Sequence, residues 1–221
     1  MTFGAPMPNQ HTSEMLVSYL RVRKLLGVLG MMLPVILIVG GLLVERIEPS
    51  ISDFCYTLYR DVFVGTLFAI GAFLVAYEGH TPADGEWFDD DLIANVAGVA
   101  AFGLALFPND GRLQPEIEVT VTQFIGAPMS AGAHYFFAFL FFVSLGLMNL
   151  LKFSKTENRR DRASYVTCGW VIFAMIGAIA VAKQLEDGPD SFVKAQNVVF
   201  WAEASGIWAF GISWWVKGHA D

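Results

Sequence analysis

Long apolar runs separated by short charged segments dominate the pattern of this chain. The hydrocarbon core of a membrane is ~30 Å thick, and about 20 helical residues are needed to cross it. Six runs approach that length, at residues 25–44, 62–77, 92–107, 134–151, 165–182 and 197–216. The pattern therefore predicts an all-α fold, an integral membrane bundle of six transmembrane helices.

These runs divide the chain into three predicted parts. Residues 1–24 form a cytoplasmic N-terminal segment, residues 25–217 a membrane domain, and residues 218–221 a cytoplasmic tail. The first run is too long, and begins too far into the chain, for a signal peptide, so we interpret it as a retained span. Residues 116–122 alternate polar with apolar side chains, which predicts a short extracytoplasmic strand or hairpin between the third and fourth spans.

Composition agrees with a membrane protein and argues against nucleic-acid binding. Of the 221 residues, 55% are hydrophobic and only 16% are charged, whereas a soluble domain carries roughly 25% charged residues. The formal net charge is −7, and nucleic acid requires a basic surface patch. We therefore expect membrane lipid, and no nucleic acid, as a partner.

The distribution of lysine and arginine predicts the orientation in the membrane. Cytoplasmic loops carry an excess of these residues. Nine of the fourteen fall on the side of the two termini, namely Arg21, Arg23, Lys24, Lys152, Lys155, Arg159, Arg160, Arg162 and Lys217. We therefore expect both termini in the cytoplasm, in a plasma membrane of the bacterial type.

Two features resemble metal sites but have simpler explanations. The acidic residues 89–91 stand directly before the third apolar run, where carboxylates cap a helix and favour its dipole. The four histidines are scattered over different segments and both sides of the predicted membrane: His11, His80, His134 and His219. The sequence thus predicts neither a metal site nor a cofactor.

Small residues at helical spacing indicate where the spans pack most closely. Ala97, Ala101 and Ala105 form a stripe on the third run. Within lipid, small side chains let helix backbones approach one another. We therefore expect the third helix to lie centrally.

Glu203 is the most unusual residue of the chain, because it lies inside the sixth apolar run. At 1.5 Å per helical residue it should be roughly 9 Å from the end of its helix. An ionisable group at such depth marks a candidate functional site. The alternative is a structural pairing with Arg60 or His134.

Further candidate site residues lie near the same predicted extracytoplasmic face. Ser52, Tyr56, Arg60 and Asp61 precede the second span, and His134 opens the fourth. We expect Glu203 to share one cavity with His134 and at least one of Arg60 and Asp61, and its hydrogen-bond donors to come from Arg60, Tyr56 or His134. Arg60 would suit a phosphate head group, because its guanidinium forms a bidentate fork.

Whether this chain is an enzyme stays open at the level of sequence. Ser52, His134 and Asp61 could supply a nucleophile, a base and an orienting group, but no Gly-x-Ser-x-Gly elbow is present. Proton-coupled transport is disfavoured, because the two halves show no internal repeat.

The chain resembles the Frag1/DRAM/Sfk1 group of six-span membrane proteins. The matching positions are Ile51-Ser52 after the first span, Ala133-His134 at the start of the fourth, and Trp201-Ala202-Glu203 in the sixth. The resemblance implies a role in lipid remodelling, lipid distribution or membrane trafficking.

Two hypotheses of function follow. The first is a lipid-handling protein whose outward polar pocket, formed by Ser52, Tyr56, Arg60, Asp61, His134 and Glu203, binds or remodels a lipid. The second is a non-catalytic accessory subunit of a larger membrane complex, with partner subunits or a second copy of the chain as its partners.

Overall fold

The computed structural model describes residues 10–79, 89–109, 120–185 and 192–219. Within these ranges the chain is helical and has no strand. Six of the described helices are long, and the others are short helical turns. The elements are α1 (Gln10–Leu43), η1 (Ser52–Tyr56), α2 (Arg60–Val75), α3 (Asp90–Leu106), α4 (Thr120–Ile125), α5 (Ala127–Leu147), η2 (Met148–Lys152), η3 (Phe153–Lys155), α6 (Arg159–Gln184), α7 (Phe192–Ala195) and α8 (Val198–Lys217).

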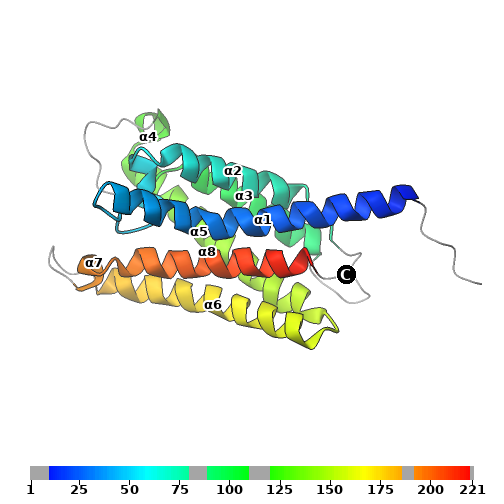
Figure 1. Ribbon diagram of the computed structural model, residues 1–221. Coiled ribbons are helices and arrows are strands. Elements are labelled where there is room, and N and C mark those ends of the chain that lie inside the picture. Colours follow the sequence, from blue (N-terminus) through cyan, green and yellow to red (C-terminus); the bar gives the residue numbers. More distant parts are fainter. Residues whose placement is uncertain (1–9, 80–88, 110–119, 186–191, 220–221) are drawn as a thin grey trace, which may run out of the picture.

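The six long helices form a bundle in which neighbours close a ring. Helix α1 packs against α2 and α8, α3 packs between α2 and α5, and α6 packs between α5 and α8. Figure 1 shows η1, α4 and α7 at one end of this bundle, and the start of α1 and the C-terminus at the other. We call these the η1 end and the opposite end.

Among the described residues, three helices are long and apolar enough to cross a membrane, covering Val17–Leu43, Ala127–Lys155 and Arg159–Gln184. Their outer surfaces carry large exposed apolar side chains, such as Phe136 on α5 and Trp170 on α6. Such surfaces are stable in lipid and aggregate in water. The chain is therefore a helical integral membrane protein.

Small residues set the closest contacts between helices. A Cβ atom on Gly211 of α8 would lie 2.7 Å from the backbone nitrogen of Met31 and 2.8 Å from the carbonyl oxygen of Gly27, both on α1. Gly71 and Gly98 produce the same close approach between α2 and α3. Packing of this kind stabilises helix pairs in lipid, where apolar burial gives little driving force.

The alanine stripe of α3 is buried, as its spacing predicts. Ala97, Ala101 and Ala105 are all enclosed by the neighbouring helices. Helix α3 packs against both α2 and α5, so the small side chains allow it to lie between them.

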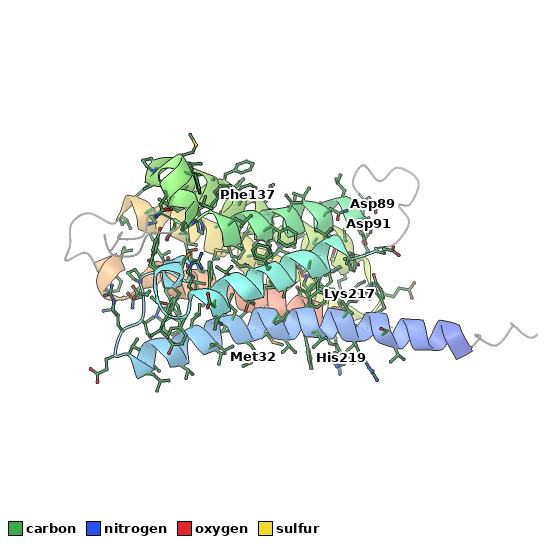
Figure 2. The ribbon with its side chains drawn as sticks, turned by 90° about the horizontal axis from the view of Figure 1, so that it is seen from above. Met32, Asp89, Asp91, Phe137, Lys217 and His219 are labelled. Carbon is green, nitrogen blue, oxygen red and sulfur yellow. The ribbon has the colours of Figure 1, made fainter. Side chains whose placement is uncertain are left out.

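Polar residues secure the opposite end of the bundle. The Asp89 carboxylate accepts a hydrogen bond from the backbone N–H of Asp91, so the predicted helix cap is confirmed. The next residue, Asp90, is buried and its Oδ1 lies 3.2 Å from Nζ of Lys152, at the end of η2. Figure 2 shows the start of α3, with Asp89 and Asp91, at the same end as Lys217 of α8.

Two features differ from the sequence-based expectations. Helix α1 begins at Gln10 and so extends well before the predicted start of the first span at Leu25. The predicted strand at residues 116–122 lies partly outside the described residues, and its described end belongs to helix α4. Only residues 120–122 of the predicted strand are described, and they form the start of α4.

Candidate functional site

The candidate site is built on the turn between α1 and α2, at the η1 end. Ser50 and Asp53 bond reciprocally, because the Ser50 N–H donates to Asp53 Oδ2 and the Asp53 N–H donates to Ser50 Oγ, each over 3.1 Å. This arrangement is that of a capping box, which satisfies backbone donors at a helix start. It fixes the first turn of η1 and therefore the position of Ser52.

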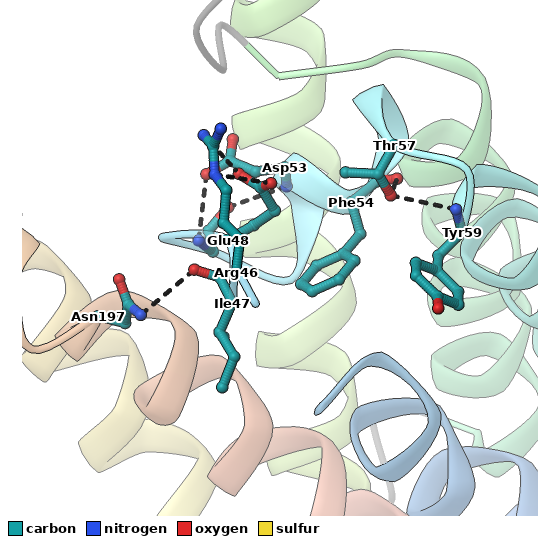
Figure 3. Close-up of polar contacts among 9 residues, drawn as sticks. Arg46, Ile47, Glu48, Asp53, Phe54, Thr57, Tyr59 and Asn197 are labelled. Carbon is teal, nitrogen blue, oxygen red and sulfur yellow. Dashed lines mark hydrogen bonds and ion pairs between the residues drawn. The ribbon is translucent and has the colours of Figure 1, made fainter. Parts of the chain in front are cut away.

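Hydrogen bonds to neighbouring segments hold this turn in place. Figure 3 shows Asn197, just before α8, with its Nδ2 donating to the Ile47 carbonyl over 3.4 Å. The Phe200 N–H of α8 donates to the Pro49 carbonyl over 2.9 Å. Within the turn, the Thr57 hydroxyl donates to the Phe54 carbonyl over 2.9 Å. The turn therefore lies across the first residues of α8.

Glu203 is bonded to this turn through the backbone. Its Oε2 accepts a hydrogen bond from the Ile51 N–H over 2.6 Å. The expected donors Arg60, Tyr56 and His134 are therefore not the ones that the structure shows for this oxygen. A main-chain N–H serves instead, because η1 places its first amides against the side of α8.

A buried hydroxyl–imidazole pair lies beside Glu203. Ser52 Oγ is 2.9 Å from Nε2 of His134, and Nδ1 of His134 is 2.7 Å from the carbonyl oxygen of Phe107. A carbonyl can only accept, so Nδ1 carries a proton and donates it. In the neutral imidazole Nε2 then has a free electron pair, which accepts the Ser52 hydroxyl proton.

Tyr56 and Asn109 complete the polar network. The Tyr56 hydroxyl donates to the Asn109 carbonyl, and Asn109 Nδ2 donates to Asp53 Oδ1 over 2.8 Å. Tyr56 is buried beneath the turn. Its hydroxyl links η1 to the segment that follows α3, and Tyr56 is not among the residues that line the cavity described next.

A cavity of about 460 Å³ opens beside the turn, between α5, α6 and α8. Its polar lining comes from Ser50, Ser52, Asp53, Asn109, His134, Lys183 and Glu203. Its apolar lining includes Ala138, Phe139, Phe142, Met175, Ile176 and Ile179. One side of the cavity is therefore polar, and the other is a hydrocarbon surface between α5 and α6.

Arg60 and Asp61 do not line this cavity, in contrast to the expectation that at least one of them would. The Asp61 side chain is 97% exposed, and its Oδ1 lies 4.0 Å from Arg60 Nη1. Both residues belong to the first turn of α2, where Arg60 is half-buried beside Cys55 of η1 and Asp61 is exposed. The cavity therefore brings together Ser52, His134 and Glu203 of the six predicted site residues.

No family model matches this chain. No curated protein and no solved structure matches it either.

Four polar residues of the cavity lining were not among the predicted site residues, namely Ser50, Asp53, Asn109 and Lys183. Ser50 and Asp53 stand between the first two predicted spans, Asn109 follows the third and Lys183 follows the fifth, where each has an ordinary structural explanation. One signal was present, because Ser50-x-x-Asp53 has the spacing of a capping box. Among the described residues, no group of three or more His, Cys, Asp and Glu side chains is arranged to hold a metal ion.

Proposed function

We propose that this protein binds a membrane amphiphile, with the polar end beside Ser52, His134 and Glu203 and the hydrocarbon chain between α5 and α6. The observation that carries this proposal is the mixed lining of the cavity, with polar side chains at the η1 end and apolar side chains farther along α5 and α6. Its volume lies in the range of small-molecule sites, roughly 300–1,000 Å³.

Exposure of the cavity wall supports entry from the lipid side. Tyr135 and Phe139 line the cavity and are 42% and 59% exposed, respectively. Both belong to α5, whose outer surface faces hydrocarbon in a membrane. The hydrocarbon chain of a bound amphiphile can therefore pass out of the cavity beside α5 and continue into the bilayer.

The polar groups of the cavity set the kind of head group it accepts. The carboxyl groups of Asp53 and Glu203 and the amine of Lys183 line it. Lys183 is a point charge and lacks the bidentate fork expected from Arg60. A polar head group that carries both hydrogen-bond donors and acceptors suits this lining, which is consistent with the lipid handling that the resemblance to the Frag1/DRAM/Sfk1 group implies.

Filling the cavity should remove the amphiphile. Ala138 of α5 lines the cavity. The indole ring of the variant Ala138→Trp would therefore fill the space that the hydrocarbon part of the amphiphile needs. Native mass spectrometry of the purified protein should find a lipid bound to the wild type and about tenfold less in this variant.

Ala178→Trp provides the matched control. Ala178 is an exposed residue of α6 and does not line the cavity, so this variant should keep the lipid. A wild-type protein that carries no lipid, but retains partner subunits through purification, would contradict the proposal and favour an accessory subunit.

We further propose that all six long helices cross the membrane, with the η1 end outside and both termini in the cytoplasm. The closed ring of helices supports this arrangement, as does the excess of lysine and arginine on the side of the termini. Helices α2 and α3 have 16 and 17 residues, about 25 Å at 1.5 Å per residue. They are short but close to the thickness of the hydrocarbon core.

Cysteine labelling can test this topology with two introduced residues. Native Cys55 is unsuitable, because it is only 2% exposed and burial raises the pKa of its thiol. Leu58 is 74% exposed beside η1, and Glu157 is exposed before α6. A membrane-impermeant maleimide should label Leu58→Cys on intact cells and Glu157→Cys only after permeabilisation; the reverse pattern would place the termini outside.

A further inference from the structure

We propose that Ser52 is a nucleophile and His134 its general base, so that the cavity hydrolyses an ester bond of the amphiphile it holds. This inference rests on the proposed binding function. The nucleophile comes from η1 and the base from α5, and both side chains line the cavity beside its polar end.

The distances fit the first requirement of such a pair. A nucleophile and its base must lie within about 2.6–3.2 Å of each other. Ser52 Oγ and His134 Nε2 are 2.9 Å apart. Because Nδ1 donates to the Phe107 carbonyl, the electron pair of Nε2 faces the hydroxyl, as proton removal requires.

The second requirement is a third group that fixes the imidazole. A carboxylate has this role in the best-known triads, and Asp61 was the candidate in the sequence. In the structure the group that orients the imidazole is the Phe107 carbonyl, whose oxygen lies 2.7 Å from Nδ1 of His134. A carbonyl oxygen fixes the tautomer and the ring plane as a carboxylate does, without adding a full charge.

The carbonyl is itself held in place, because three successive carbonyls of this segment accept side-chain bonds. Phe107 accepts from His134, Pro108 accepts from the Ser130 hydroxyl over 2.9 Å, and Asn109 accepts from the Tyr56 hydroxyl. Ser130 and His134 are one turn apart on α5. Such support keeps reacting groups within a small distance of their working geometry.

The chemistry proceeds in two balanced steps. In the first step, Ser52 Oγ attacks the ester carbonyl carbon while Nε2 of His134 accepts the hydroxyl proton. The carbon–oxygen bond of the ester then breaks, and the leaving alcohol takes this proton from Nε2. Water next attacks the acyl group on Oγ and gives a proton to Nε2. The Oγ–carbon bond breaks, Ser52 recovers the proton, and a carboxylic acid leaves.

Charge develops on the carbonyl oxygen in both steps and requires a positive or hydrogen-bond-donating group. Lys183 is the cation among the described residues that line the cavity. Its ammonium group comes from the last turn of α6. We assign it this stabilising role.

An alkyl fluorophosphonate, whose chain matches the apolar side of the cavity, tests the nucleophile in the purified full-length protein. Intact-mass and peptide analysis should find one adduct, on Ser52. Ser52→Ala should give none, and His134→Gln should react about 100-fold more slowly, since a general base contributes about 10²–10⁴. Ser164→Ala should react as the wild type does, because this half-buried serine lies near the start of α6, far along the helix from Lys183.

Hydrolysis of p-nitrophenyl myristate in detergent provides a second measurement. The wild type should release nitrophenol about 100-fold faster than Ser52→Ala. If the wild type holds a lipid by native mass spectrometry yet shows neither the adduct nor ester cleavage above Ser52→Ala, hydrolysis is overturned and binding remains. If no lipid is bound and neither reaction occurs, both proposals fail.

Discussion

Replacing Gly211 with leucine should separate α1 from α8 and prevent the bundle from assembling. A Cβ atom at this position would meet the Met31 nitrogen at 2.7 Å and the Gly27 carbonyl at 2.8 Å. Both neighbours are backbone atoms, so no rotamer change can relieve the contact. Overpacking typically costs about 1–3 kcal/mol and can cost more, and we expect a cost of at least about 3 kcal/mol here.

Thermal unfolding in detergent, followed by a thiol-reactive dye, measures this effect directly. Both cysteines, Cys55 and Cys168, are buried, so they react only as the bundle opens. The control is Gly177→Leu, because a Cβ atom on this α6 glycine would meet no atom within 4 Å. An unfolding midpoint for Gly211→Leu equal to that of the control would show that α1 and α8 can move apart without cost.

Replacing Glu203 with alanine should destabilise the η1 turn, and replacing it with glutamine should not. The carboxylate accepts the Ile51 N–H over 2.6 Å, and the alanine variant leaves this amide without that partner. An unpaired buried group costs about 1–3 kcal/mol. In Glu203→Gln the amide oxygen can still accept this bond, so the fold should persist.

The same dye separates the two variants, because Cys55 lies within the η1 turn. Its thiol should become reactive at a lower temperature in Glu203→Ala than in the wild type, and at nearly the wild-type temperature in Glu203→Gln. Lipid retention should change in both variants, since Glu203 lines the cavity. Equal stability of all three proteins would mean that the bond to Ile51 contributes nothing to the turn.

Helix positions were largely predictable from the sequence. The apolar run at residues 165–182 falls inside α6, and the run at residues 197–216 matches α8 within a residue at each end. The cap at Asp89 and the buried alanine stripe on α3 were predictable for the same reason. Each is a local property, set by side chains a few positions apart on one helix.

The candidate site was predictable only in part. Ser52, His134 and Glu203 were predicted as site residues because they are polar and lie in or near apolar runs. All three line one cavity. Arg60 was expected in the same pocket, but it lies half-buried beside Cys55 and is not among the residues that line the cavity. The hydrogen-bond donor to Glu203, the backbone N–H of Ile51, could not be predicted from the sequence. Every residue except proline has a backbone N–H, so no residue type marks this donor.

The sequence by itself determined that this chain is a helical membrane protein, because the length and composition of an apolar run decide its partition into lipid. Only the tertiary structure decided which polar residues meet. Ser52 and His134 are 82 positions apart and Ile51 and Glu203 are 152 apart, and contacts at such separations depend on how the helices pack. The packing depends on the close approach of helices at particular glycines and on the position of the η1 turn. Neither is a property of a single segment.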